Sequence, residues 1–147
     1  MKKILCIIAF VAFAFNGLAQ DGKLRLGANI GFTTGGNNSD LVIGADLDYL
    51  FNAENKRFQI GAASGLFVVT DFNGIVLPLA FAGRFDATDK INLGVDAGYG
   101  IGINNANNGF YFRPIFEYKL SSNIALRASY TGIGGGGYLN AGIMFNL

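Results

Sequence analysis

The sequence predicts an all-β protein, an eight-stranded antiparallel up-and-down transmembrane β-barrel, and three observations support this fold class. Residues 91–103 alternate strictly between apolar residues and small or polar ones, which is the period of a β-strand. Charged residues make up only 14% of the 147 residues, against roughly 25% in soluble domains. After the N-terminus, however, no apolar run reaches the ~20 residues that a membrane helix needs. A closed barrel is then the structure that pairs every backbone group inside a bilayer.

The N-terminus has the three parts of a secretory signal peptide. Lys2 and Lys3 supply positive charge, residues 4–15 are apolar, and Gly17-Leu18-Ala19 offers a small-x-small cleavage site. The single cysteine lies in this leader, so the mature chain would have no thiol chemistry. We expect two segments, a signal peptide at 1–19 and one barrel domain at 20–147.

The mature chain divides into eight alternating segments, separated by runs rich in Gly, Asn, Asp and Ser that predict loops and turns. In each segment the apolar side chains share one face, which we expect to contact lipid, and small or charged residues share the face that lines the lumen. An even number of strands places both termini on the same side of the membrane. The predicted strands are 23–33, 41–51, 57–69, 75–86, 91–103, 110–120, 124–132 and 138–147.

Two features interrupt this pattern. Phe67 and Val69 fall on the inward face of their segment although they are apolar, and we expect a bulge or an emerging loop there. Pro78 and Pro114 lie within strands, where each removes a ladder hydrogen bond. We expect local bulges at both prolines.

Aromatic residues gather near the two ends of the predicted strands, which is typical of girdles at the two lipid interfaces. One group lies near the short turns and the other near the loops. The two groups are Tyr49, Phe51, Phe58, Phe85, Tyr118 and Phe145, and Phe32, Phe110, Phe112 and Tyr130.

The predicted lumen carries charges of both signs, which must pair in a narrow barrel. Eight strands leave an interior that side chains can fill rather than a wide channel. Because glycines line the loop-side half, we expect a salt-bridged plug toward the turns and a cup open toward the loops. These glycines are Gly31, Gly44, Gly65, Gly98, Gly100 and Gly102. The lumen charge network is predicted to comprise Arg25, Asp46, Asp48, Arg57, Arg84, Asp86, Asp96, Arg113, Glu117, Lys119 and Arg127.

The composition also excludes several classes of function. With no histidine in the chain, a Ser-His-Asp arrangement and a histidine general base are impossible. Without the two lysines of the leader, the 11 basic residues fall to 9 against 10 acidic ones, which gives no basis for nucleic-acid binding. Asp46 and Asp48 share a face, but pairing with lumen arginines explains them better than catalysis does. We expect no enzyme, no cofactor and no metal site.

Four stretches carry a likeness to a known family: the leader ending Gly17-Leu18-Ala19, the segment Leu77-Pro78-Leu79, the Gly-rich residues 93–103, and the terminal Phe145-Asn146-Leu147. Through them the chain resembles the outer membrane protein beta-barrel domain family of Gram-negative bacteria, which is porin-like. The resemblance implies a place in the cell outer membrane, in contact with its lipid, after secretion through the inner membrane.

The resemblance also implies a partner during insertion, the barrel-assembly machinery. In that family the machinery reads apolar residues at alternate positions up to the C-terminal residue, which is usually Phe. The matching residues here are Leu139, Ala141, Ile143, Phe145 and Leu147.

Three functions remain open. The leading interpretation is an integral outer-membrane barrel with a structural or surface-interaction role and no catalysis. The first alternative is a narrow pore or small-ligand-binding cup, and the second is a secreted soluble barrel of lipocalin type with the aromatic residues inside. The specific ligand is unknown from the sequence.

Overall fold

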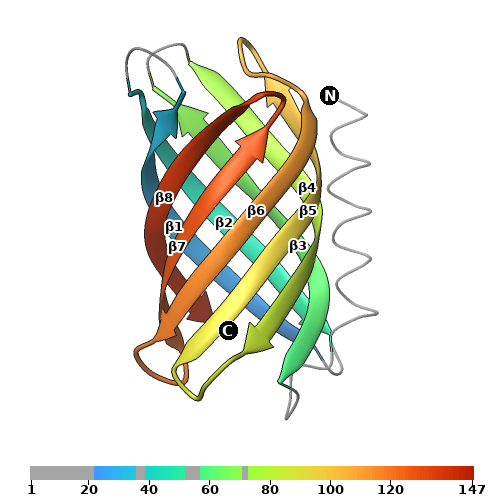
Figure 1. The fold of residues 1–147 in the computed structure, drawn as a ribbon, viewed down its shortest axis with the longest axis vertical. Helices are drawn as coiled ribbons and strands as arrows, with labels where there is room; N and C mark the ends of the chain where they lie inside the picture. The colour runs from blue at the N-terminus through green and yellow to red at the C-terminus, as the bar shows by residue number, and fades with distance from the viewer. Residues whose placement is uncertain (1–21, 36–38, 52–56, 71–72) are drawn as a thin grey trace.

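The structure is a computed structural model that describes residues 22–35, 39–51, 57–70 and 73–147. In this part of the chain, eight antiparallel strands close into a barrel in which each strand pairs with the next and β8 pairs with β1 (Figure 1). The predicted fold class is confirmed. The strands are β1 (Gly22–Thr34), β2 (Leu41–Phe51), β3 (Phe58–Val69), β4 (Gly74–Asp86), β5 (Ile91–Ile103), β6 (Gly109–Lys119), β7 (Ile124–Ile133) and β8 (Gly136–Asn146).

The two ends of the barrel are called here the loop side and the turn side. The loop side, at the top of Figure 1, holds the connections after β1, β3, β5 and β7. The turn side holds the other connections, the start of β1 and the end of β8. The predicted signal peptide at 1–19 lies outside the described residues. Among the residues that are described, no helix is long and apolar enough to cross a membrane.

The last connection is shorter than predicted. β8 begins at Gly136, which pairs with Ile133, so residues 133–137 are not a loop. Gly134 and Gly135 alone form the turn, with φ angles of 53° and 88°. Positive φ at both central residues matches the right-handed twist of a hairpin and favours glycine.

The outward face of the barrel is apolar, as the alternation predicted, and the inward face carries buried charges together with a group of apolar side chains toward the loops. Large apolar side chains remain exposed around the barrel, including Ile30, Ile43, Phe81 and Phe110. Inward positions on the same strands carry buried arginine and carboxylate side chains. The lipocalin-type alternative is therefore wrong, because it requires the aromatic face to line the interior.

The expected bulge in β3 is absent. The β2–β3 register runs without an insertion from Phe51↔Ile60 to Val42↔Val69. Phe67 and Val69 keep their inward positions in this register and are buried inside the lumen. Their apolar character reflects an apolar layer in the interior, which is described below, and not a change of face.

The prolines also leave the register unchanged. The β3–β4 pairing stops at Ser64↔Leu79 and resumes at Phe67↔Val76 in the same register, and the β6–β7 pairing is likewise interrupted opposite Pro114. The Ser64 hydroxyl donates a 2.9 Å hydrogen bond to the carbonyl of Pro78. A proline removes a donor without adding a residue, so the ladder loses pairs and the predicted bulges do not form.

Candidate functional site

The turn-side half of the lumen is filled by buried charges that we call the ionic layer. Its side chains come from β1, β2, β4, β5, β6 and β7, and each is at most 5% exposed. Among the described residues it contains four arginines and four carboxylates, so its formal charge is zero. The ionic layer consists of Arg25, Asp46, Asp48, Arg84, Asp96, Arg113, Glu117 and Arg127.

Asp48 is the centre of the ionic layer. Its Oδ2 atom lies 2.8 Å from Nη2 of Arg84, 2.5 Å from Nη2 of Arg127 and 3.6 Å from Nη1 of Arg25. Arg25 faces Asp48 across the β1–β2 ladder, whereas Arg84 and Arg127 reach it from β4 and β7. One carboxylate thus ties strands from different walls of the barrel together.

A second centre lies at Asp46, nearer the middle of the barrel. Arg113 donates from Nη1 and Nη2 to the two carboxylate oxygens of Asp46, at 2.6 and 3.1 Å. The same guanidinium donates from Nε to the Ser129 hydroxyl at 2.9 Å, and Asn29 donates to Asp46 at 3.0 Å. The carbon of the guanidinium lies 5.3 Å from the centre of the Phe67 ring. Such two-point arginine–carboxylate pairs fix geometry as well as charge.

The remaining carboxylates of the ionic layer are also paired. Glu117 accepts from Arg25 at 2.7 Å and from Nε of Arg127 at 2.8 Å. Asp96 accepts from Nη1 of Arg84 at 2.6 Å. Removing one partner from a buried pair costs about 3–5 kcal/mol because the other charge is left unpaired. The ionic layer therefore holds the strands at fixed positions across the lumen.

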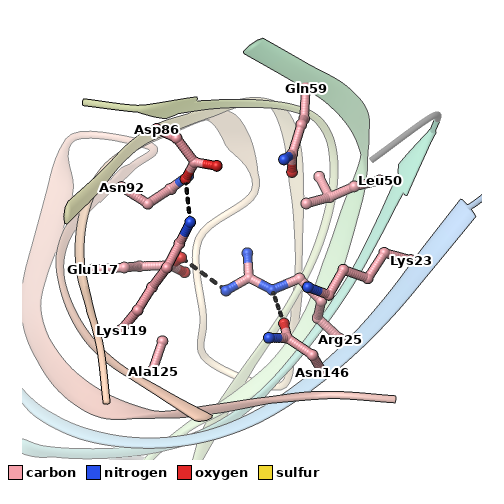
Figure 2. A pocket seen from close by; sticks show the side chains of 10 residues that line it. All are labelled: Lys23, Arg25, Leu50, Gln59, Asp86, Asn92, Glu117, Lys119, Ala125 and Asn146. Carbon is pink, nitrogen blue, oxygen red and sulfur yellow. Dashed lines mark hydrogen bonds and ion pairs between the residues drawn. The ribbon is translucent and has the colours of Figure 1, made fainter. Parts of the chain in front are cut away.

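At the turn-side mouth, Arg25 and Glu117 of the ionic layer lie near Lys119 and Asp86 (Figure 2). There Lys119 donates to Asp86 at 2.6 Å, and Asn92 donates to the same carboxylate at 2.9 Å. The lysine and aspartate side chains are 34% and 23% exposed. These two predicted members of the charge network therefore form a separate pair at the edge of water. A pocket of about 40 Å³ beside them has room for little more than water.

Arg57 differs from the prediction. It precedes β3, is exposed, and makes no side-chain ion pair or hydrogen bond with the described part of the chain. Its carbonyl accepts a 2.7 Å hydrogen bond from the Asp86 amide. β3 begins one residue later than predicted, and Arg57 is exposed at the rim of the barrel and is not part of the ionic layer.

An apolar layer covers the ionic layer on the loop side, and charge patterning gave no sign of it. Its side chains are at most 7% exposed and come from β2, β3, β4, β7 and β8. The available signal was the apolar residue at an inward position, which Phe67 and Val69 display. The apolar layer consists of Val42, Phe67, Val69, Val76, Ile133 and Tyr138.

The glycines of the loop-side half make room for this layer. A Cβ atom at Gly44 would overlap the ring of Phe67, and one at Gly100 would overlap Ile133. The expectation that these glycines line an open cup is therefore wrong at these two positions, because large side chains from other strands occupy the space. The cup that does exist lies above the apolar layer, is lined in part by Thr33, Asp40 and Ala106, and has a volume of about 290 Å³.

Uncharged polar residues complete the lumen and were not singled out in the sequence. Asn29 and Ser129 bind the Asp46–Arg113 pair, and Asn146 accepts a 3.0 Å hydrogen bond from Nε of Arg25. Their inward position was visible in the alternation. Over the described residues, no three His, Cys, Asp or Glu side chains are grouped so as to hold a metal ion.

The predicted assembly residues lie on the outward face of the C-terminal strand. Leu139, Ala141 and Phe145 are exposed and Ile143 is partly exposed along β8. Leu147 follows the strand and donates from its amide to the carbonyl of Leu24 at 2.9 Å.

A closed antiparallel barrel with an apolar outer face and charged side chains in its interior is typical of transmembrane β-barrels. Comparison with solved structures agrees with this fold, whereas comparison of the sequence with families found no match.

No known family model matches the sequence. No curated protein matches it either.

Several solved structures match over most of their length. A de novo designed transmembrane β-barrel is 16% identical, with a TM-score of 0.63, over 87% of this chain and 98% of the designed one. The N-terminal β-barrel domain of OprF from Pseudomonas aeruginosa is 17% identical, with a TM-score of 0.60 and the same coverage. Ail, the attachment invasion locus protein of Yersinia pestis, is 11% identical, with a TM-score of 0.57, over 86% and 97%. The chain has the fold of the integral outer-membrane β-barrels.

Proposed function

We propose that this protein is an integral outer-membrane barrel that acts in a structural or surface-interaction role and performs no catalysis. The observation that carries this proposal is the double closure of the lumen. The ionic layer fills the turn-side half and the apolar layer fills the space above it. A barrel filled in this way by its described side chains offers its outer face to lipid and its loop side to the surroundings.

The pore alternative is tested by conductance. Purified protein in planar lipid bilayers should show no stable conductance steps, while a wide porin in the same bilayers provides the positive control. Large, reproducible steps from the unmodified protein would overturn the sealed lumen and favour the pore.

The charge of the loop-side connections limits the kind of partner that this surface could bind. Ail has been solved in complex with the heparin analogue sucrose octasulfate, an anionic ligand. In this chain the connections at 34–40, 70–73, 104–108 and 134–135 contain no lysine or arginine. Sulfated or phosphorylated partners would lack a cation there, so the proposed surface partner is uncharged or cationic.

Secretion and assembly complete the proposal. Residues 1–19 act as a signal peptide for passage through the inner membrane, and the barrel-assembly machinery reads the alternating apolar residues of β8. The mature chain should then fractionate with the outer membrane and change its gel mobility when boiled in SDS. Recovery in the soluble fraction, with no effect of boiling, would contradict this placement.

A further inference from the structure

The cup on the loop side is lined by both apolar and polar residues. Its volume of about 290 Å³ is close to the lower end of the range of small-molecule pockets, roughly 300–1,000 Å³. Val69, Val76 and Ile133 supply its apolar surface, and Thr33 and Asp40 lie among its polar lining residues. A compact molecule with an apolar body and one polar group matches this combination.

The apolar surface of the cup is formed before any ligand arrives. Val69, Val76 and Ile133 also belong to the apolar layer, in which Phe67 and Tyr138 pack with ring centres 5.5 Å apart. Because the space beneath is filled, these side chains cannot collapse away from the cup. A preformed apolar surface lowers the ordering cost of binding.

Hydrogen bonds fix the walls of the cup as well. The Asp40 amide donates to the Thr33 hydroxyl at 2.8 Å, and the Asp40 carbonyl accepts from the Thr33 amide at 2.9 Å. On the β5–β6 connection, the Gly102 amide donates to Oδ1 of Asn108 at 2.7 Å. This bond helps to hold the connection whose Ala106 packs against the apolar layer.

The charge around the cup selects among ligands. Asp40 carries the only charge among the described residues that line it, and the loop-side connections contain no lysine or arginine. Arg113 lies on the turn side of the apolar layer, against the ring of Phe67. Its guanidinium is ion-paired with Asp46. The carboxylate of Asp40 would therefore repel an anion in the cup, and the lining residues that the structure describes include no lysine or arginine to offset this repulsion.

We propose that the cup binds a small amphipathic molecule that is uncharged or cationic, with its apolar part on Val69, Val76 and Ile133 and its polar group toward Asp40. This inference rests on the proposed surface role and deepens it, because it gives the class of ligand that the loop side would take from the surroundings.

The test uses three probes that share a phenyl ring and differ in charge: 2-phenylethylamine, 2-phenylethanol and 3-phenylpropionate. The mature protein is placed in lipid nanodiscs, and the methyl NMR signals of Val69, Val76 and Ile133 are followed during titration. The amine and the alcohol should shift these signals saturably, and the carboxylate should shift them far less. The outward methyl groups of Ile43 and Leu79 report partition of the probes into lipid.

Two variants sharpen the result. Ala106→Phe fills the cup from an exposed connection and should abolish the saturable shifts, while unchanged signals of Ile43 and Leu79 report an intact barrel. Asp40→Asn should weaken binding of the amine about two- to fivefold, which is the range expected for an exposed ion pair. The affinity for the alcohol should stay the same. Asp89→Asn, at an exposed turn-side position, is the matched control and should change neither.

The inference fails if no probe gives saturable shifts, if the shifts appear equally at Ile43 and Leu79, or if the carboxylate binds as tightly as the amine. Failure of the proposed function is recognised separately. If the protein fractionates with the outer membrane and changes mobility on boiling, but its cup signals do not shift, only the inference about the ligand fails. If the protein is soluble and shows no mobility change on boiling, the proposed function itself is contradicted.

Discussion

Arg113 on β6 holds both carboxylate oxygens of Asp46 on β2, at 2.6 and 3.1 Å, across the interior of the barrel. The residue opposite Arg113 in the β5–β6 ladder is Asp96. Asp96 pairs instead with Arg84 from the neighbouring β4. The ion pairs of the lumen therefore do not simply follow the ladder, and those between distant strands depend on closure of the barrel.

The first prediction concerns this pair. Arg113→Ala leaves Asp46 buried without its main partner, so the free energy of unfolding should fall by about 3–5 kcal/mol. Urea unfolding of the protein folded in lipid vesicles measures the change. The exposed Arg57→Ala is the control and should stay within about 0.5 kcal/mol. Equal effects of the two substitutions would mean that the ionic layer adds no stability.

The second prediction concerns the apolar layer. A Cβ atom at Gly44 would overlap the Phe67 ring, so Gly44→Ala should destabilise the barrel by about 1–3 kcal/mol. Much of this cost should disappear when Phe67→Ala is already present, and a double-mutant cycle measures the coupling. Gly83→Ala is the control, because the nearest atoms to its Cβ lie at 3.6 and 3.9 Å. Strict additivity would contradict this account of the lumen glycines.

The third prediction concerns the β7–β8 turn. Gly135 has a φ of 88° and a Cβ there would meet open space, so only backbone strain opposes substitution. Gly135→Ala should lower the free energy of unfolding by about 1 kcal/mol, and Gly135→Asn should cost less, because asparagine tolerates positive φ. Thermal or urea unfolding distinguishes the two. If both substitutions lower the free energy of unfolding equally, the positive φ would not be the cause of the loss.

The fourth prediction concerns assembly. Phe145→Ala removes an outward aromatic from the proposed assembly signal and should slow the appearance of the boiling-sensitive form in cells. Phe85→Ala removes an exposed aromatic from β4 and controls for the loss of lipid-facing area. Pulse-chase gels follow both proteins, and identical time courses would argue against a special role for the C-terminal strand.

The alternation of residues determined the fold class and the face of almost every side chain. It placed the strands β2 and β5 at their observed bounds and put Asp46, Asp48 and Arg127 in the lumen, because face depends only on the period of two along a strand. The apolar residue at the inward position of Phe67 suggested a bulge or an emerging loop, and the hydrogen bonds removed by Pro78 and Pro114 suggested two more bulges. A register without insertions, which only pairing with neighbouring strands reveals, removed them.

The sequence by itself therefore determined which residues face lipid and which face the lumen. The tertiary structure decided which of them meet. Asp48 contacts arginines from β1, β4 and β7, and Phe67 lies over the space left by Gly44. Those contacts join residues far apart in the chain, and their identity depends on strand stagger and on barrel closure. The division into an ionic layer, an apolar layer and a cup follows from that closure, because side chains from opposite walls compete for one narrow interior.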